Sequence, residues 1–68
     1  MLRKFMGGEI ATAIIEAIEA IPADCEIVTL HAGENMAIRC AFIAKGDEGG
    51  YVPEYAWDGV KWNDIGYL

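Results

Sequence analysis

The sequence lacks basic residues over a long stretch, and this gap is its most informative feature. Between Lys4 and Arg39 there is no lysine or arginine, although six of the 11 acidic residues lie there. The gap carries a charge of −6, the first four residues carry +2, and the chain from Arg39 onward carries −2. Such a concentrated charge favours a basic partner and repels nucleic acid and anionic membrane surfaces. The six carboxylates, which we predict to bind a protein, are Glu9, Glu16, Glu19, Asp24, Glu26 and Glu34.

Serine is absent and histidine occurs once, so few catalytic schemes remain. Without serine, every mechanism that uses a serine nucleophile is excluded. Cys25 and His31 share a face of the predicted sheet, but six strand residues would separate them by about 20 Å, far beyond hydrogen-bond reach. Cys40 lies nearer to His31 in the predicted pairing, but on the opposite face. We therefore expect a protein that is not an enzyme, with two reduced thiols in place of a disulfide.

Metal and cofactor motifs are also missing. The chain has one histidine, two widely spaced cysteines and no Cys-x-x-Cys pair, which argues against a zinc site. The loop at residues 46–50 places Asp47 and Glu48 among glycines, but it has neither the spaced carboxylates of a calcium loop nor the Lys-Ser/Thr of a phosphate loop. We expect no metal and no cofactor.

No long apolar run is present. No segment approaches the roughly 20 apolar residues needed to span a bilayer, and no signal-length apolar stretch follows the basic start of the chain. The polar side of the predicted helix is acidic, unlike that of a helix that binds membrane surfaces. These absences predict a single soluble domain, residues 1–68, in the cytoplasm and away from membranes.

What the sequence does have is 54% hydrophobic residues and one clear helical pattern. Residues 9–21 are predicted to be helical because isoleucines recur at the spacing of one helical face, and Pro22 ends the pattern. Ala13, Ala17 and Ala20 form an edge of small residues that permits close approach of another backbone. That neighbour is either the sheet of the same chain, which we favour, or a second protein chain.

Residues 26–32 and 36–45 are predicted to be two strands of a hairpin. Gly33-Glu34-Asn35 fits a three-residue loop, which places Leu30 opposite Ile38 and leaves one face of the hairpin almost wholly apolar.

Residues 51–57 and 60–67 are predicted to form a second hairpin. Asp58-Gly59 is a strong two-residue turn signal, which pairs Trp57 with Val60. Pro53 has no backbone donor, so its strand is expected to lie at a sheet edge or to carry a bulge. The expected fold is α+β: one N-terminal helix packed on a four-stranded antiparallel sheet, in the order α-β-β-β-β.

Two surfaces are candidates for function. The first is the acidic side of the helix, where Glu16 and Glu19 lie near the C-terminal end, although the helix dipole disfavours acids there and no lysine follows at i+4. A row of carboxylates can stand in for phosphates against a basic groove. The same row is equally expected of a face that only keeps the protein soluble.

The second candidate is the aromatic hairpin, since tyrosine and tryptophan anchor many protein interfaces and also stack on sugars. Its residues 55–62 resemble hairpins common in phage structural proteins, mainly through their turn residues. The alternative is that these rings complete the small core. The residues of this surface are Tyr51, Tyr55, Trp57 and Trp62.

These features predict a small, non-catalytic, protein-binding domain that occupies a basic surface of a nucleic-acid-handling protein or complex. Direct nucleic-acid binding is not expected, because five scattered basic residues form no patch. Small acidic inhibitors from phages and mobile elements, such as anti-CRISPR proteins, are the class that fits this size and charge, by analogy alone. A structural protein that forms homo-oligomers is the first alternative, and a carbohydrate-binding module is the second.

Overall fold

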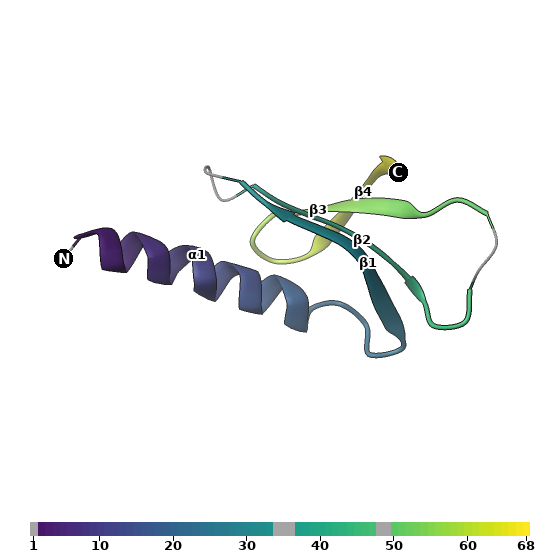
Figure 1. Cartoon of the computed structure of the whole chain (residues 1–68), viewed down its shortest axis with the longest axis horizontal. Coiled ribbons are helices and arrows are strands. Elements are labelled where there is room, and N and C mark those ends of the chain that lie inside the picture. Colours follow the sequence, from purple (N-terminus) through teal and green to yellow (C-terminus); the bar gives the residue numbers. More distant parts are fainter. Residues whose placement is uncertain (1, 34–36, 48–49) are drawn as a thin grey trace.

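The computed structural model describes residues 2–33, 37–47 and 50–68, with side chains described from residue 10 onward. One helix precedes a single four-stranded antiparallel sheet whose strands lie in chain order, as Figure 1 shows. This confirms the α+β fold expected from the sequence. The elements are α1 (Leu2–Glu19), β1 (Cys25–Ala32), β2 (Ile38–Ala44), β3 (Pro53–Trp57) and β4 (Trp62–Tyr67).

The helix is longer at its start than predicted. It begins at Leu2 and continues through Gly7-Gly8, because two glycines weaken a helix by about 1 kcal/mol each without forcing it to break. At the other end, the amide of Ala20 donates to the carbonyls of both Glu16 (3.1 Å) and Ala17 (3.2 Å). The helix thus tightens into its last turn just before Pro22.

The predicted register of the first hairpin was wrong by two residues. Leu30 pairs with Cys40 and Ala32 with Ile38, and the amide of Gly33 donates to the carbonyl of Ala37 at 2.7 Å. This bond leaves three residues, 34–36, between the bonded positions, one place later than the predicted loop 33–35, and they lie outside the described residues. A shift of two preserves the alternation of a strand, so the predicted apolar face of β2 is still the buried one.

A β-bulge at Val28 corrects a second prediction. Ile27 pairs with Phe42, but Thr29 pairs with Ala41, so one extra residue interrupts the alternation of β1. As a result Cys25 and His31 lie on opposite faces of the sheet, where we had expected them on the same face.

The second hairpin is also shifted by two residues from its predicted register. Trp57 pairs with Trp62, so four residues connect β3 to β4 instead of two. Pro53 opens β3, but the irregularity between Glu54 and Tyr55 leaves Ile65 of β4 as the extra residue, so the bulge lies in β4 and not, as expected, in the strand of Pro53. The strand is not at an edge, because β3 lies between β2 and β4.

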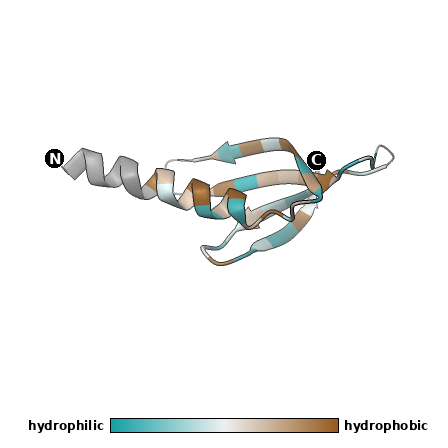
Figure 2. Ribbon diagram, turned by 90° about the horizontal axis from the view of Figure 1, so that it is seen from below, coloured by the Kyte–Doolittle hydropathy of each residue, from teal (hydrophilic) through white to brown (hydrophobic). Residues whose placement is uncertain are grey.

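The core lies between α1 and one face of the sheet. Phe42 stacks on Tyr55 with ring centroids 4.2 Å apart and meets the edge of Trp62 at 5.9 Å. Ala17 is fully buried, and its carbonyl accepts a hydrogen bond from Nε1 of Trp62. At Ala17, the small-residue edge therefore packs within the chain. Figure 2 shows the C-terminal part of α1 lying over the middle of the sheet and leaving β1 uncovered at one edge.

Candidate functional site

The two predicted surfaces meet at a hollow between α1 and the β3–β4 loop. Its volume is about 360 Å³. Glu16 comes from the acidic side of the helix and Trp57 from the aromatic hairpin. Neither prediction placed these two residues together, because the sequence does not show where the helix crosses the sheet. The lining residues are Ala13, Glu16, Trp57, Asp58 and Gly59.

Asp58 shapes the loop side of this hollow. Its Oδ1 accepts hydrogen bonds from the amides of Val60 and Lys61, both at 2.8 Å, and its Oδ2 accepts one from Nδ2 of Asn63 at 2.9 Å. These bonds favour the charged carboxylate and lower the pKa of Asp58 to about 2. Asp58 therefore carries a full negative charge at neutral pH. Sequence reasoning treated Asp58 only as a turn residue and missed this role.

The helix side of the hollow carries an unengaged carboxylate. Glu16 is exposed, and among the described side chains it makes neither a hydrogen bond nor an ion pair. Glu19 and Glu26 are also exposed and, among the described side chains, also make neither a hydrogen bond nor an ion pair. Neither of these two residues lines the hollow. Asp24 is exposed and receives a weak hydrogen bond from Sγ of Cys25 at 3.8 Å.

Two of the predicted acidic residues cannot be placed. The side chain of Glu9 and the whole of Glu34 lie outside the described residues. The structure therefore brings one predicted acid, Glu16, to the hollow and adds Asp58, which was not predicted as a binding residue.

The aromatic residues of the hairpin do not form one surface. Tyr55 and Trp62 pack around Phe42 in the core. Trp57 is half-buried beside Trp62, with ring centroids 5.2 Å apart, and is one of the residues that line the hollow. Tyr51 precedes the opposite end of β3, where it pairs with Tyr67 at 5.2 Å and stays 80% exposed.

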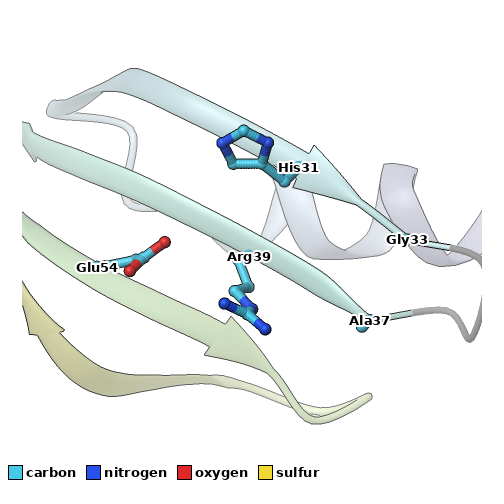
Figure 3. Close-up of a pocket in the computed structure, with 5 residues that line it drawn as sticks. All are labelled: His31, Gly33, Ala37, Arg39 and Glu54. Carbon is cyan, nitrogen blue, oxygen red and sulfur yellow. The ribbon is translucent and has the colours of Figure 1, made fainter. Parts of the chain in front are cut away.

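A second hollow of about 370 Å³ lies on the other face of the sheet. Figure 3 shows His31, Arg39 and Glu54 projecting from β1, β2 and β3, with the helix behind the sheet. Neither thiol lines it, and Cys40 points to the opposite face, as predicted. The sequence did not predict this hollow.

Cys25 and Cys40 are both free. Burial raises the pKa of each thiol, and the Asp24 carboxylate raises that of Cys25 further. In the described part of the chain, no three His, Cys, Asp or Glu side chains gather as metal ligands would. Among these same residues, no helix has the length and apolar character to cross a membrane.

Comparison with known proteins finds no matching family model, no similar curated protein and no similar solved structure.

Proposed function

We propose that this chain is a small, non-catalytic, protein-binding domain that receives a basic side chain of its partner in the hollow between α1 and the β3–β4 loop. One observation carries the proposal: two acidic residues, Glu16 and Asp58, and an aromatic residue, Trp57, line the same hollow. Anionic groups beside an aromatic ring suit a lysine or arginine side chain, which gains charge attraction and a cation–π contact together.

Arginine fits this hollow better than lysine. Its planar guanidinium stacks on an indole and also donates several hydrogen bonds in fixed directions, whereas a lysine ammonium acts as a compact point charge. The contact with Trp57 is worth about 0.5–1 kcal/mol at an exposed site. The carboxyl of Asp58 stays ionised because its pKa is about 2, so its charge is present throughout the neutral range.

The charge of the whole chain supports the same partner. A net charge of −6 steers a basic surface toward the protein and speeds association at low salt. A partner that presents arginine to the hollow is then a protein with a cationic, nucleic-acid-binding groove. Occupying that groove would inhibit the partner, and by analogy of size and charge alone we assign the chain to the class of small acidic phage and mobile-element inhibitors, such as anti-CRISPR proteins.

A binding experiment with an octa-arginine peptide tests the hollow, using tryptophan fluorescence and calorimetry. The wild type is compared with Glu16→Gln in the hollow and with Glu26→Gln on β1, which removes the same charge elsewhere. We expect Glu16→Gln to weaken binding several-fold more than Glu26→Gln, and Trp57→Leu to weaken it further. Equal losses in the two glutamine variants would mean that only net charge matters.

A pull-down from the lysate of the source organism then tests the partner class, with captured proteins read by mass spectrometry. The wild type should retain a basic nucleic-acid-binding protein, and the Glu16→Gln/Trp57→Leu variant should lose it while Glu26→Gln keeps it. Capture of the same partner by all three proteins would place the binding surface elsewhere.

A further inference from the structure

The outer edge of β1 is open and apolar. β1 is an edge strand of eight residues without lysine or proline, the residues that commonly protect such edges. Ile27 is 43% exposed, Val28 44% and Leu30 37%. A long edge of this kind offers unpaired backbone groups to another strand.

The helix extends the apolar surface beside β1. Ile15 and Ile18 are 55% and 38% exposed. Ala13 and Glu16 border the hollow on the β3–β4 side of α1, so helical spacing places Ile18 on the opposite flank, toward β1, whereas Ile15 lies about 160° round the helix from buried Ala17 and points away from the sheet. Ile27 and Leu30 also project to the helix side of the sheet, since they pair with buried Phe42 and Cys40.

The chain exposes more surface than a compact monomer of its mass is expected to expose. The accessible surface is 5027 Å², whereas a compact monomer of 7.4 kDa exposes about 4,200 Å². The excess is about 800 Å², which is the share that each partner buries in a standard protein interface. An excess of this size is large enough to supply one standard interface.

We propose that the partner at this interface is a second copy of the chain, and that β1 pairs antiparallel with β1 of that copy to make a continuous eight-stranded sheet. The bulge at Val28 makes the strand self-complementary. It allows a symmetric register in which Ile27 lies opposite Leu30 of the copy on the helix side of the sheet, while Glu26 lies opposite His31 of the copy on the other side. Without the bulge, each of these pairs would point to opposite faces.

The charge of the chain does not oppose this pairing. Glu26 is the only acidic residue of β1, and in this register it meets a histidine. Two-fold symmetry makes each pair occur twice, once on each side of the axis. The hollow at Glu16 lies on the other flank of α1 and remains open in the dimer, so this proposal stands apart from the proposed function.

Analytical ultracentrifugation over 1–500 µM tests the dimer, with circular dichroism as a check on folding. The wild type should sediment as a dimer. Ile27→Lys should sediment as a monomer, because it buries a charge opposite Leu30 of the copy. Val60→Lys is the matched control, since Val60 is 82% exposed in the β3–β4 loop, and it should remain a dimer. A monomeric wild type at 500 µM, or equal effects of the two lysine variants, would overturn the proposal.

A charge exchange tests the register even if Ile27→Lys fails to fold. Glu26→His places two histidines opposite each other, and His31→Glu places two glutamates opposite each other. Each single variant should weaken the dimer on the order of tenfold, because two cross-strand pairs are lost. The Glu26→His/His31→Glu double variant exchanges the partners and should restore wild-type affinity. A double variant as weak as the single variants would rule out this register.

Discussion

The indole of Trp62 donates a hydrogen bond of 2.8 Å from Nε1 to the backbone carbonyl of Ala17, 45 residues earlier in the chain. Ala17 lies in the last turn of α1, where carbonyls lack a full set of partners within the helix. The bond therefore gives this helix-end carbonyl a second donor beside the amide of Ala20, and it joins the helix to the last strand of the sheet. The same ring meets the edge of Phe42, so one side chain links α1, β4 and β2.

Trp62→Phe should lower the free energy of unfolding by about 1–2 kcal/mol, because it removes this hydrogen bond and part of the buried ring. In a domain of this size each kcal/mol lowers Tm by roughly 4–8 °C, which a thermal melt resolves. Trp57→Phe is the matched control, since the described part of the structure gives the Trp57 indole no hydrogen bond. An equal loss in both variants would contradict the structural role of the Trp62–Ala17 bond.

Asp58→Asn should reduce stability at neutral pH and have little effect in strong acid. The pKa of Asp58 is lowered from its ordinary value of 3.8 to about 2, by the hydrogen bond from Asn63 first and by the amides of Lys61 and Val60 next. A lowered pKa means that the carboxylate stabilises the fold above about pH 4, and that this contribution is lost as pH falls through 2.

The corresponding measurement is Tm of both proteins at pH 7, 4 and 2. The gap between wild type and Asp58→Asn should be largest at pH 7 and close toward pH 2. Other acidic residues titrate in both proteins and cancel in the difference. A gap of constant size across this range would show that the charge of Asp58 is not what holds the loop.

From the sequence, the helix, the strands and the buried side of β2 were predicted better than the residue pairing between the strands. Recurring isoleucines identified the helix, and alternation in β2 identified Ile38, Cys40 and Phe42 as the side of the strand that is buried. Near their loops both hairpins were wrong by two residues, an even number, so the predicted faces of these side chains were still right, whereas beyond each bulge the error is odd and the faces are reversed, as at Cys25. Loop length could not be read from Asp58-Gly59, because the Asp58 side chain caps two amides and holds a four-residue connection.

The bulge and the hollow were beyond sequence reasoning for different reasons. Ile27 and Val28 are both apolar, so the pattern of β1 gives no sign that Val28 is the extra residue. Glu16 and Trp57 lie 41 positions apart and meet only because α1 crosses the second hairpin. The acidic character of Glu16 and the aromatic character of Trp57 were recognised separately, but their combination belongs to the tertiary structure.

Gly59→Ala should destabilise the protein by about 1 kcal/mol. Gly59 has φ of +100°, a conformation that residues with a Cβ rarely adopt, although nothing lies within 4 Å of the added methyl group. The expected cost is therefore purely conformational. Gly33→Ala is the control, because Gly33 has no positive φ and its Cβ would meet the Ala37 carbonyl at an ordinary 3.6 Å. Urea denaturation should separate the two variants, and equal stability would refute the role assigned to φ.

The two thiols should differ in reactivity toward Ellman's reagent. Cys40 is fully buried beneath α1, so it should react only when the protein unfolds. Cys25 is half-buried, and burial together with the Asp24 carboxylate raises its pKa, so it should react slowly at neutral pH and faster as pH rises. The Cys25→Ala and Cys40→Ala variants assign the two rates, and guanidinium should make both thiols react at once. Equal labelling of both in the native protein would mean that the core around Phe42 opens far more readily than its stacked and edge-on rings indicate.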